Sequence, residues 1–350
     1  MLFIAAAVWA TSSVPFGTKC DPCELTPSPL LNALSHWDGS WYVQIARDGY
    51  SYQPGVRSSV TFFPILPLLM RASAQVLGRV DNSTLTAAGI VIANAALLVA
   101  LAYLVELGRL EGDVAAGRRA ALYLLVFPTT IFLSAVYPTS LFLAFAIGAV
   151  VEVRRQRWAL SAALAGLAAL ARPYGVALVV PLALEAIAKR DLPGNARRLA
   201  ALGVPVAAFV GWQAYLYRTF GDPLLFIQAQ LAYGRRPSLP LKEIGDLFDR
   251  NVYGFPWIVA AVVALITVLV VWSWRRTAPP TAGLATAVYL VALSSGTLTS
   301  FPRYALAIFP AFVVLGMVGT RRAIGITYVV IAGVIALVFA AMFGSWYWIG

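Results

Sequence analysis

SHWDGSWYVQIARDGY, residues 35–50, is a compact aromatic and acidic segment in a chain that otherwise consists largely of apolar runs. It lies within residues 17–84, one of two long polar stretches that separate those runs. The repeated apolar runs decide the class of fold. Any chemistry is expected to start in this segment.

The composition is that of a polytopic membrane protein. Apolar residues make up 60% of the chain and charged residues 12%, and the mean hydropathy is +0.79, values far from those of soluble domains. The net charge of +11 does not indicate a nucleic-acid partner, because the basic residues occur in small clusters between apolar runs. We therefore predict an all-α bundle whose surroundings are membrane lipids.

About eleven spans are predicted in a single membrane domain, residues 1–350. The first, 1–16, is short and lacks a preceding basic residue, so either the true start lies upstream or this span is marginal. Outer loops are expected at 17–84, with juxtamembrane helices, and at 218–254. The other spans are predicted in the central region 85–217, at 85–108, 120–136, 139–153, 158–171, 174–188 and 199–217, and in the C-terminal region 255–350, at 255–274, 281–298, 304–319 and 323–343.

Clusters of basic residues orient the bundle. They fall in alternate short connections, as the positive-inside rule requires of cytoplasmic loops. The segment 35–50 is then on the outer side. The clusters are Arg109, Arg118 and Arg119; Arg154, Arg155 and Arg157; Lys189, Arg190, Arg197 and Arg198; Arg275 and Arg276; and Arg321 and Arg322.

Residues 60–78 are apolar enough to be a span, but counting them as one would invert this orientation. Arg71 in the middle and Pro67 near the start also argue against a lipid-facing span. We interpret this segment as a juxtamembrane or re-entrant helix on the outer face. The C-terminal Trp346-Tyr347-Trp348 is expected to form an aromatic belt at the outer interface.

Several predicted spans are short. Fifteen helical residues rise about 22 Å, against a hydrocarbon core of about 30 Å. The outer turns should therefore dip into the membrane, where non-helical backbone must be buried in protein or line a cavity. We predict a polar cavity in the outer half, on the side of Asp38, Tyr137, Arg172, Arg303 and Tyr304.

Asp38 is the candidate general base, because Trp37 and Trp41 shield its carboxylate partly from water. An alternative is structural. Ser35-x-x-Asp38 also fits a capping pattern, in which Asp38 closes the first turn of a helix that runs to about Arg47 and stops at Gly49.

Arg172 and Arg303 are candidates for a phosphate clamp, with Tyr304 beside the second. An arginine within the membrane is costly enough to suggest a partner, most simply an anion. Alternatively, Arg172 reaches the interface or pairs with an acidic residue. The turn after Tyr137 offers the hydroxyls of Thr139 and Ser140, which a helix N-cap explains equally well.

The sequence contains no pattern for a metal or a nucleotide. His36 is the only histidine, and no P-loop, G-x-G-x-x-G after a strand or D-x-D pair is present. We expect neither a cofactor nor a metal, and a substrate delivered by lipid. Cys20 and Cys23 form one C-x-x-C, interpreted as a loop disulfide or two free thiols rather than a redox site.

Several motifs follow one another along the chain. The first two are Trp37-Asp38-Gly39-x-Trp41-Tyr42-x-x-Ile45-Ala46-x-x-Gly49-Tyr50 and Phe62-Phe63-Pro64-x-x-Pro67-Leu68-Leu69. The later ones are Tyr137-x-x-Ser140-Leu141-Phe142, Ala171-Arg172-Pro173-x-Gly175, Gly221-Asp222-Pro223-Leu224 with Phe226 and Gln230, and Arg303-Tyr304. Together they resemble the signature of the PIG-V-like mannosyltransferases, a branch of the GT-C membrane glycosyltransferases.

The resemblance implies a GT-C bundle with an acidic residue in the first outer loop and a polyprenyl-phosphate sugar as donor. It implies mannose as the sugar, whereas no residue pattern does. The Ala- and Arg-rich chain resembles a bacterial homologue, so a bacterial plasma membrane is expected and the acceptor, whether lipid, glycan or protein, stays open.

In this interpretation Asp38 takes the proton of an acceptor hydroxyl while the anomeric carbon inverts, and the two arginines stabilise the departing phosphate. Trp37, Trp41, Tyr42 and Tyr137 are candidates for sugar contacts, and Phe62 and Phe63 for contacts with the prenyl chain. Simple interfacial anchoring is the alternative for these aromatic side chains. For the whole protein the alternatives are a transporter or flippase, or a noncatalytic membrane subunit.

Overall fold

The computed structural model describes residues 2–13, 24–188, 195–236 and 255–349, and within these ranges the regular structure is helical throughout. Cys20, Cys23 and residues 237–254 of the second outer loop lie outside them. The elements are α1 Leu2–Ser13, α2 Pro29–Ala33, α3 Asp38–Asp48, η1 Ser59–Thr61, α4 Ile65–Val76, α5 Asn82–Leu110, α6 Val114–Leu125, α7 Ile131–Ser134, α8 Thr139–Arg154, α9 Trp158–Ala171, η2 Pro173–Leu178, α10 Val179–Ala188, α11 Asn195–Phe220, α12 Leu225–Leu231, α14 Pro256–Arg276, α15 Pro279–Leu293, α16 Phe301–Ala305, α17 Phe309–Val318 and α18 Arg322–Gly344.

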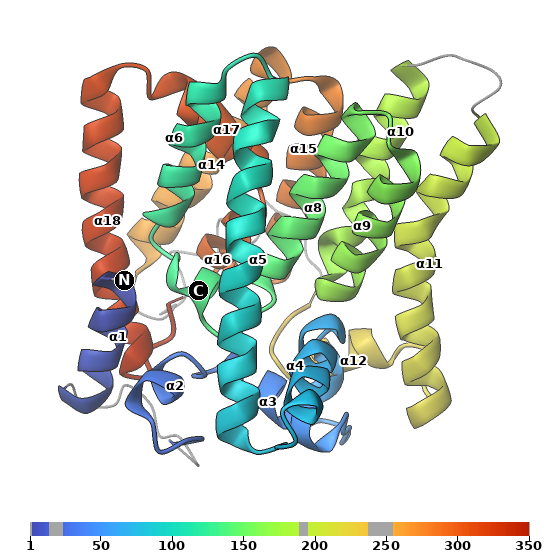
Figure 1. The fold of residues 1–350 in the computed structure, drawn as a ribbon, viewed down its shortest axis with the longest axis vertical. Coiled ribbons are helices and arrows are strands. Elements are labelled where there is room, and N and C mark those ends of the chain that lie inside the picture. Colours follow the sequence, from blue (N-terminus) through green and yellow to red (C-terminus); the bar gives the residue numbers. More distant parts are fainter. Residues whose placement is uncertain (1, 14–23, 189–194, 237–254, 350) are drawn as a thin grey trace.

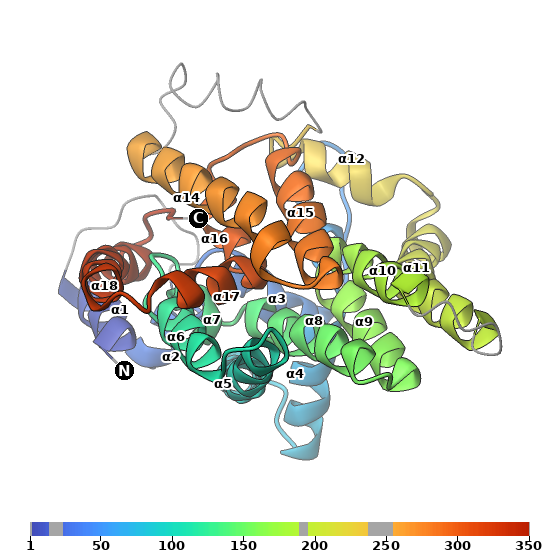
Figure 2. The ribbon, with the colours of Figure 1, turned by 90° about the horizontal axis from the view of Figure 1, so that it is seen from above.

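The longer helices stand side by side, and the short helices α2, α3, α4 and α12 gather at the lower end of the bundle (Figure 1). Helix α5 spans the full height and packs on α6 and α8, while α9 packs on α8 and α11 (Figure 2). Helices α1 and α18 pack together at the opposite side from α11. The predicted all-α bundle is confirmed.

By length and composition, four described helices can cross a membrane alone: α5, residues 198–220 of α11, α14 and α18. The other apolar helices are shorter, α1, α4, α9, the stretch 173–188, α15 and α17 among them. The expectation of many short spans is thus confirmed. A helix needs about 20 residues to cross a bilayer core of about 30 Å. The shorter helices of the bundle therefore reach only part of the way across.

Three predicted spans differ from the helices found. The span 120–136 is broken after Leu125, because Pro128 lacks an N–H and restricts the residue before it. The span 281–298 ends at Leu293, shortly before Gly296, which has a φ of 84°. The span 304–319 consists of α16 and α17, and Pro310 begins the second of these.

Helix α4 fits the interpretation of residues 60–78 as a short outer element. Its 12 residues rise about 18 Å, too little to cross the hydrocarbon core. Arg71 Nη1 donates to the carbonyl oxygens of Ala46 at 3.2 Å and Arg47 at 3.0 Å, at the C-terminal end of α3. This arginine therefore ties two short helices together.

The described arginine clusters gather at the end of the bundle opposite α3 (Figure 1). There they meet buried acids. Glu111 accepts from Arg154 Nη1 at 2.9 Å, from the Ala278 N–H at 2.7 Å and from Thr281 Oγ1 at 2.7 Å, which joins α5, α8 and α15. The arginine clusters that indicate the orientation of the bundle therefore also take part in a network of ion pairs and hydrogen bonds that stabilises one end of it.

Candidate active site

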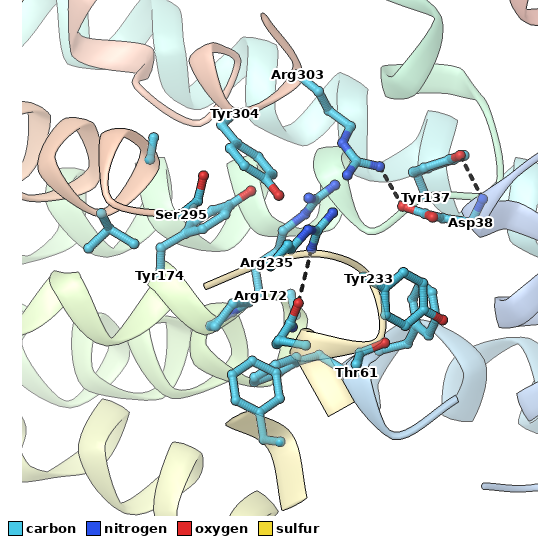
Figure 3. A pocket seen from close by; sticks show the side chains of 18 of the residues that line it. Asp38, Thr61, Tyr137, Arg172, Tyr174, Tyr233, Arg235, Ser295, Arg303 and Tyr304 are labelled. Carbon is cyan, nitrogen blue, oxygen red and sulfur yellow. Dashed lines mark hydrogen bonds and ion pairs between the residues drawn. The ribbon is translucent and has the colours of Figure 1, made fainter. Parts of the chain in front are cut away.

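A cavity of about 380 Å³ opens at the α3 end of the bundle. Figure 3 shows Arg172, Arg235 and Tyr304 extending into the same space, with Asp38 and Tyr137 at one side. The predicted residues Asp38, Tyr42, Phe62, Phe63, Tyr137, Arg172, Arg303 and Tyr304 all line it. The prediction of one cavity that joins Asp38 to the two arginines is confirmed.

Asp38 is the first residue of α3 and is paired with Arg303 from α16. Arg303 Nη1 lies 2.5 Å from Asp38 Oδ2, across 265 positions of sequence. The Asp38 side chain is 23% exposed and that of Arg303 only 3%. The ion pair fixes Oδ2, while Oδ1 accepts no hydrogen bond from any described residue.

Tyr137 holds the backbone on which Asp38 sits. Its hydroxyl accepts from the Asp38 N–H at 3.0 Å and donates to the His36 carbonyl oxygen at 3.2 Å. The side chain is buried, and both roles of its hydroxyl are used. We conclude that this tyrosine positions Asp38 through the protein backbone, although its ring also lines the cavity.

The prediction that Asp38 caps the first turn of α3 is wrong, whereas the prediction that Gly49 ends this helix is confirmed. The N-cap is Trp37, with no side-chain hydrogen bond to the first turn, and Ser35 Oγ donates to Asn32 O instead. The Asp38 carboxylate points to Arg303 rather than to the helix. At the other end Gly49, with a φ of 89°, ends α3 after Asp48, as predicted.

Arg172 is buried and faces the cavity. It follows α9 in extended conformation, and its Nη2 donates to Thr139 Oγ1 at 2.6 Å. Neither alternative for this arginine holds: it is 8% exposed, so it does not reach the interface, and no acidic partner occurs among the described residues. Thr139 is an acceptor for this arginine and not a helix cap.

Gly175 makes the turn after Arg172 possible. Its N–H donates to the Arg172 carbonyl oxygen at 2.9 Å. A Cβ at this position would overlap the backbone of Ala168 in α9. The Ala171-Arg172-Pro173-x-Gly175 motif therefore forms a turn that packs closely on α9. This turn places the Arg172 side chain in the cavity.

Arg235 is a cavity residue that the sequence analysis did not identify. It lies just after α12, in the predicted second outer loop, and its Nη1 donates to Gln230 Oε1 at 3.3 Å. No acidic side chain pairs with it in the part of the chain that the structure describes. The basic pair Arg235-Arg236 beside Phe226 and Gln230 was the available signal. Tyr174 and Tyr233 were missed in the same way.

The cavity holds an excess of positive charge. It contains three arginines and one carboxylate among the described residues. Arg303 is neutralised by Asp38, which leaves the charges of Arg172 and Arg235. Arg172 is buried and Arg235 partly buried, and arginines without acidic partners are costly in a membrane. An anionic ligand is therefore the simplest explanation of this arrangement.

Trp37 and Trp41 do not line this cavity. They line a second one, of about 450 Å³, together with Trp346 and Trp348. The expected C-terminal aromatic belt is wrong for Trp346, which is 8% exposed and stacks on His36 with 4.1 Å between ring centroids. Trp348 lies 5.0 Å from the Arg303 guanidinium. The segment turns inward because these aromatic and cationic partners bury it.

His36 is neutral at physiological pH. Burial lowers its pKa to about 4, although its hydrogen bond to the Phe343 carbonyl opposes that shift. Its Nδ1 lies 3.1 Å from that carbonyl oxygen. Hence the only histidine joins the loop before α3 to the end of α18. No cluster of three His, Cys, Asp or Glu residues occurs in the described ranges, and the expectation of a metal-free reaction stays a prediction.

Comparison with known proteins agrees with this site. Residues 20–190 match the family model described as Mannosyltransferase (PIG-V). This part of the chain is therefore similar to the PIG-V mannosyltransferases. The match covers just under half of the chain and contains Asp38, Tyr137 and Arg172, whereas Arg235 and Arg303 lie beyond it. The predicted resemblance is confirmed. The curated proteins give no match.

The fold is that of the GT-C glycosyltransferases. ArnT from Cupriavidus metallidurans bound to undecaprenyl phosphate matches with a TM-score of 0.52 at 18% identity, over 91% of this chain and 60% of that one. Apo ArnT matches with 0.55 at 15%, over 100% and 77%. The apo oligosaccharyltransferase of Archaeoglobus fulgidus matches with 0.51 at 12%, over 99% and 56%. The chain thus spans little more than half the length of some proteins that share its fold. Its fold and its long apolar helices are those of an integral membrane protein.

Proposed function

We propose that this protein transfers mannose from a polyprenyl-phosphate donor to an acceptor hydroxyl, with inversion, on the outer side of a bacterial plasma membrane. The observation that carries the proposal is the cavity in which Asp38 faces Arg172, Arg235 and Arg303. The family match favours a glycosyltransferase over the alternative of a transporter.

The donor phosphate fits the two arginines that have no acidic partner. A phosphodiester carries one negative charge, and the departing polyprenyl phosphate carries close to two at neutral pH, by analogy with other phosphate monoesters. Arg172 and Arg235 match the charge of the product better than that of the donor. Preorganised cations that bind the developing charge most strongly lower the barrier to its departure. Undecaprenyl phosphate bound to ArnT, a protein of the same fold, supports this donor class.

Asp38 supplies the base. The acceptor oxygen attacks the anomeric carbon, its proton passes to Asp38 Oδ1, and the bond from that carbon to the phosphate oxygen breaks. The electron pair of that bond leaves with the polyprenyl phosphate. Arg303 donates to Oδ2 and so orients the carboxylate. Phe62, Phe63 and Phe226 give one side of the cavity an apolar surface suited to the first prenyl units.

The test uses the full chain in lipid nanodiscs with radiolabelled polyprenyl-phosphomannose and a panel of acceptors. Asp38→Asn is expected to reduce transfer by about 10²- to 10⁴-fold, the usual contribution of a general base. Asp48→Asn is the matched control, because Asp48 lies on the same helix but is paired with Arg47 at the surface. Undiminished transfer by Asp38→Asn would reject the base. Equal transfer from GDP-mannose, or none from any lipid donor, would reject the proposed function.

A further inference from the structure

The second cavity adjoins the first at the Asp38 carboxylate. Asp38, Tyr233 and Arg235 line both cavities. One side of this boundary holds Arg172, Arg303 and the phenylalanines, and the other holds the indoles. A base between two cavities can take a proton from a hydroxyl group of a molecule in one cavity while that oxygen attacks a molecule in the other.

The walls of the second cavity combine flat aromatic rings and hydroxyl groups with the guanidinium groups of Arg57 and Arg235. The rings are those of Trp37, Trp41, Trp346 and Trp348, and the hydroxyls those of Ser40, Thr297, Thr299 and Ser300. Its volume of about 450 Å³ falls in the range of roughly 300–1,000 Å³ typical of small-molecule sites. Apolar rings beside a few placed polar groups suit a compact ligand with one apolar face and a hydroxyl-bearing edge.

Two of these tryptophans are held in unusual backbone conformations. Trp37 has a φ of 58° and Trp346 a φ of 61°, and only Gln156 joins them among the described non-glycine residues with positive φ. Tyr137 fixes the peptide groups on either side of Trp37, and the His36 ring stacks on Trp346. Strained residues that their surroundings hold in place concentrate at ligand sites.

We propose that the second cavity is the acceptor site and that its indole walls bind a pyranose ring, either of a free oligosaccharide or of a glycolipid headgroup. This inference rests on the proposed function. A sugar ring places its C–H face on an indole and directs its hydroxyls to Thr297, Thr299 and Asp38. The attacking hydroxyl then approaches the anomeric carbon from the side opposite the phosphate bound by Arg172 and Arg235.

Trp41 is the residue to test, because it lines the second cavity without contacting Asp38 or Arg303 in any recorded interaction. In the full chain in nanodiscs, Trp41→Ala is expected to raise the KM for a mannobiose or an alkyl mannoside acceptor at least tenfold. The KM for the donor should stay within twofold. Trp41→Phe should recover most of the loss, and Thr299→Val should raise the acceptor KM by several-fold.

Trp274→Ala is the matched control, because Trp274 is 52% exposed on α14 and lines neither cavity. Mannobiose and the alkyl mannoside distinguish the two sources of the ring, since a lipid headgroup site favours the second. An unchanged acceptor KM in both Trp41→Ala and Thr299→Val, with active wild type, would overturn the acceptor site and leave the proposed function intact. A peptide that accepts mannose while both sugars fail would also overturn it.

Binding measured without the donor separates this inference from the proposed function. Titration of mannobiose is expected to change the intrinsic tryptophan fluorescence of the wild type, with a Kd at least tenfold weaker in Trp41→Ala. The open-chain polyol mannitol is the control ligand. Equal affinity of wild type and Trp41→Ala for mannobiose, or equal affinity for mannitol and mannobiose, would contradict the site whether or not a lipid donor is used.

Discussion

Asp38→Asn removes one partner of a mostly buried ion pair, so this variant tests stability as well as chemistry. It leaves the Arg303 guanidinium, 3% exposed, without its carboxylate. Removing one partner of a buried pair costs about 3–5 kcal/mol, since the remaining charge stays desolvated. Four aromatic rings, of Phe132, Tyr137, Tyr304 and Trp348, lie within 5.7 Å of Arg303 Cζ and stabilise the cation. We therefore expect a cost near the lower limit, about 3 kcal/mol.

The paired variant Asp38→Asn with Arg303→Gln separates the two effects. Its two amides can hydrogen-bond to each other, and no buried charge is left. At about 2 °C per kcal/mol for a chain of this size, Asp38→Asn alone should lower Tm by about 6 °C. The double variant should recover at least half of that, because residues in direct contact are not additive. Transfer should stay reduced by about 10²- to 10⁴-fold in both variants.

Thermal unfolding in nanodiscs, followed by circular dichroism, measures the four Tm values of this cycle. Asp48→Asn should stay within about 2 °C of the wild type, because an exposed pair is worth about 1 kcal/mol or less. If the loss of Tm in the double variant equals the sum of the losses in the two single variants, Asp38 and Arg303 are not energetically coupled. An unchanged Tm in Asp38→Asn would show that Arg303 does not depend on this carboxylate.

Two further predictions follow from contacts around the site. Gly175→Ala forces a Cβ against the Ala168 backbone, so we expect the free energy of unfolding to fall by about 1–3 kcal/mol and the donor KM to rise as Arg172 moves. Gly203→Ala, with nothing within 4 Å of its Cβ, should change neither quantity. Equal Tm values for the two variants would contradict this prediction. His36 has a folded pKa of about 4 against 6.5 unfolded, so below pH 6.5 the unfolded state binds more protons and stability falls as pH falls, by roughly 3 kcal/mol at full extent. His36→Asn keeps an N–H donor for Phe343 but does not titrate, so its Tm should fall less between pH 7.5 and 4.5; parallel Tm curves would exclude this histidine as the cause.

The hydropathy pattern predicted most helices because each is a local property of the chain. Composition indicated the bundle, and alternation of the arginine clusters separated the end with Glu111 from the end with Asp38. Helix breaks after Leu125 and around Pro310 were missed, since a hydropathy window averages over a proline that interrupts hydrogen bonding within a continuous apolar run.

The sequence predicted which residues share the site but not which of them form an ion pair. Sidedness was enough to group Asp38, Arg172 and Arg303. It could not show that Arg303 pairs with Asp38, because the two lie 265 residues apart and only the tertiary fold, in which α16 packs on α14 and α15, brings them together. Arg235 was overlooked because a basic pair in a polar loop looks like any solvated charge. Trp346 was misplaced because interfacial anchoring and burial against His36 begin from the same aromatic composition.

The inward turn of the C-terminal segment has a consequence for biosynthesis. The described residues that line the first cavity all precede position 305, whereas the second cavity needs Trp346 and Trp348. During translation the N-terminal elements are made and inserted first. A nascent chain can therefore complete the walls of the first cavity while it is still being synthesised. The indole wall of the second cavity is added only after α18 has packed on α1, where Ser345 Oγ donates to Ala10 O. In the function that we propose, transfer then requires α18 to be correctly placed.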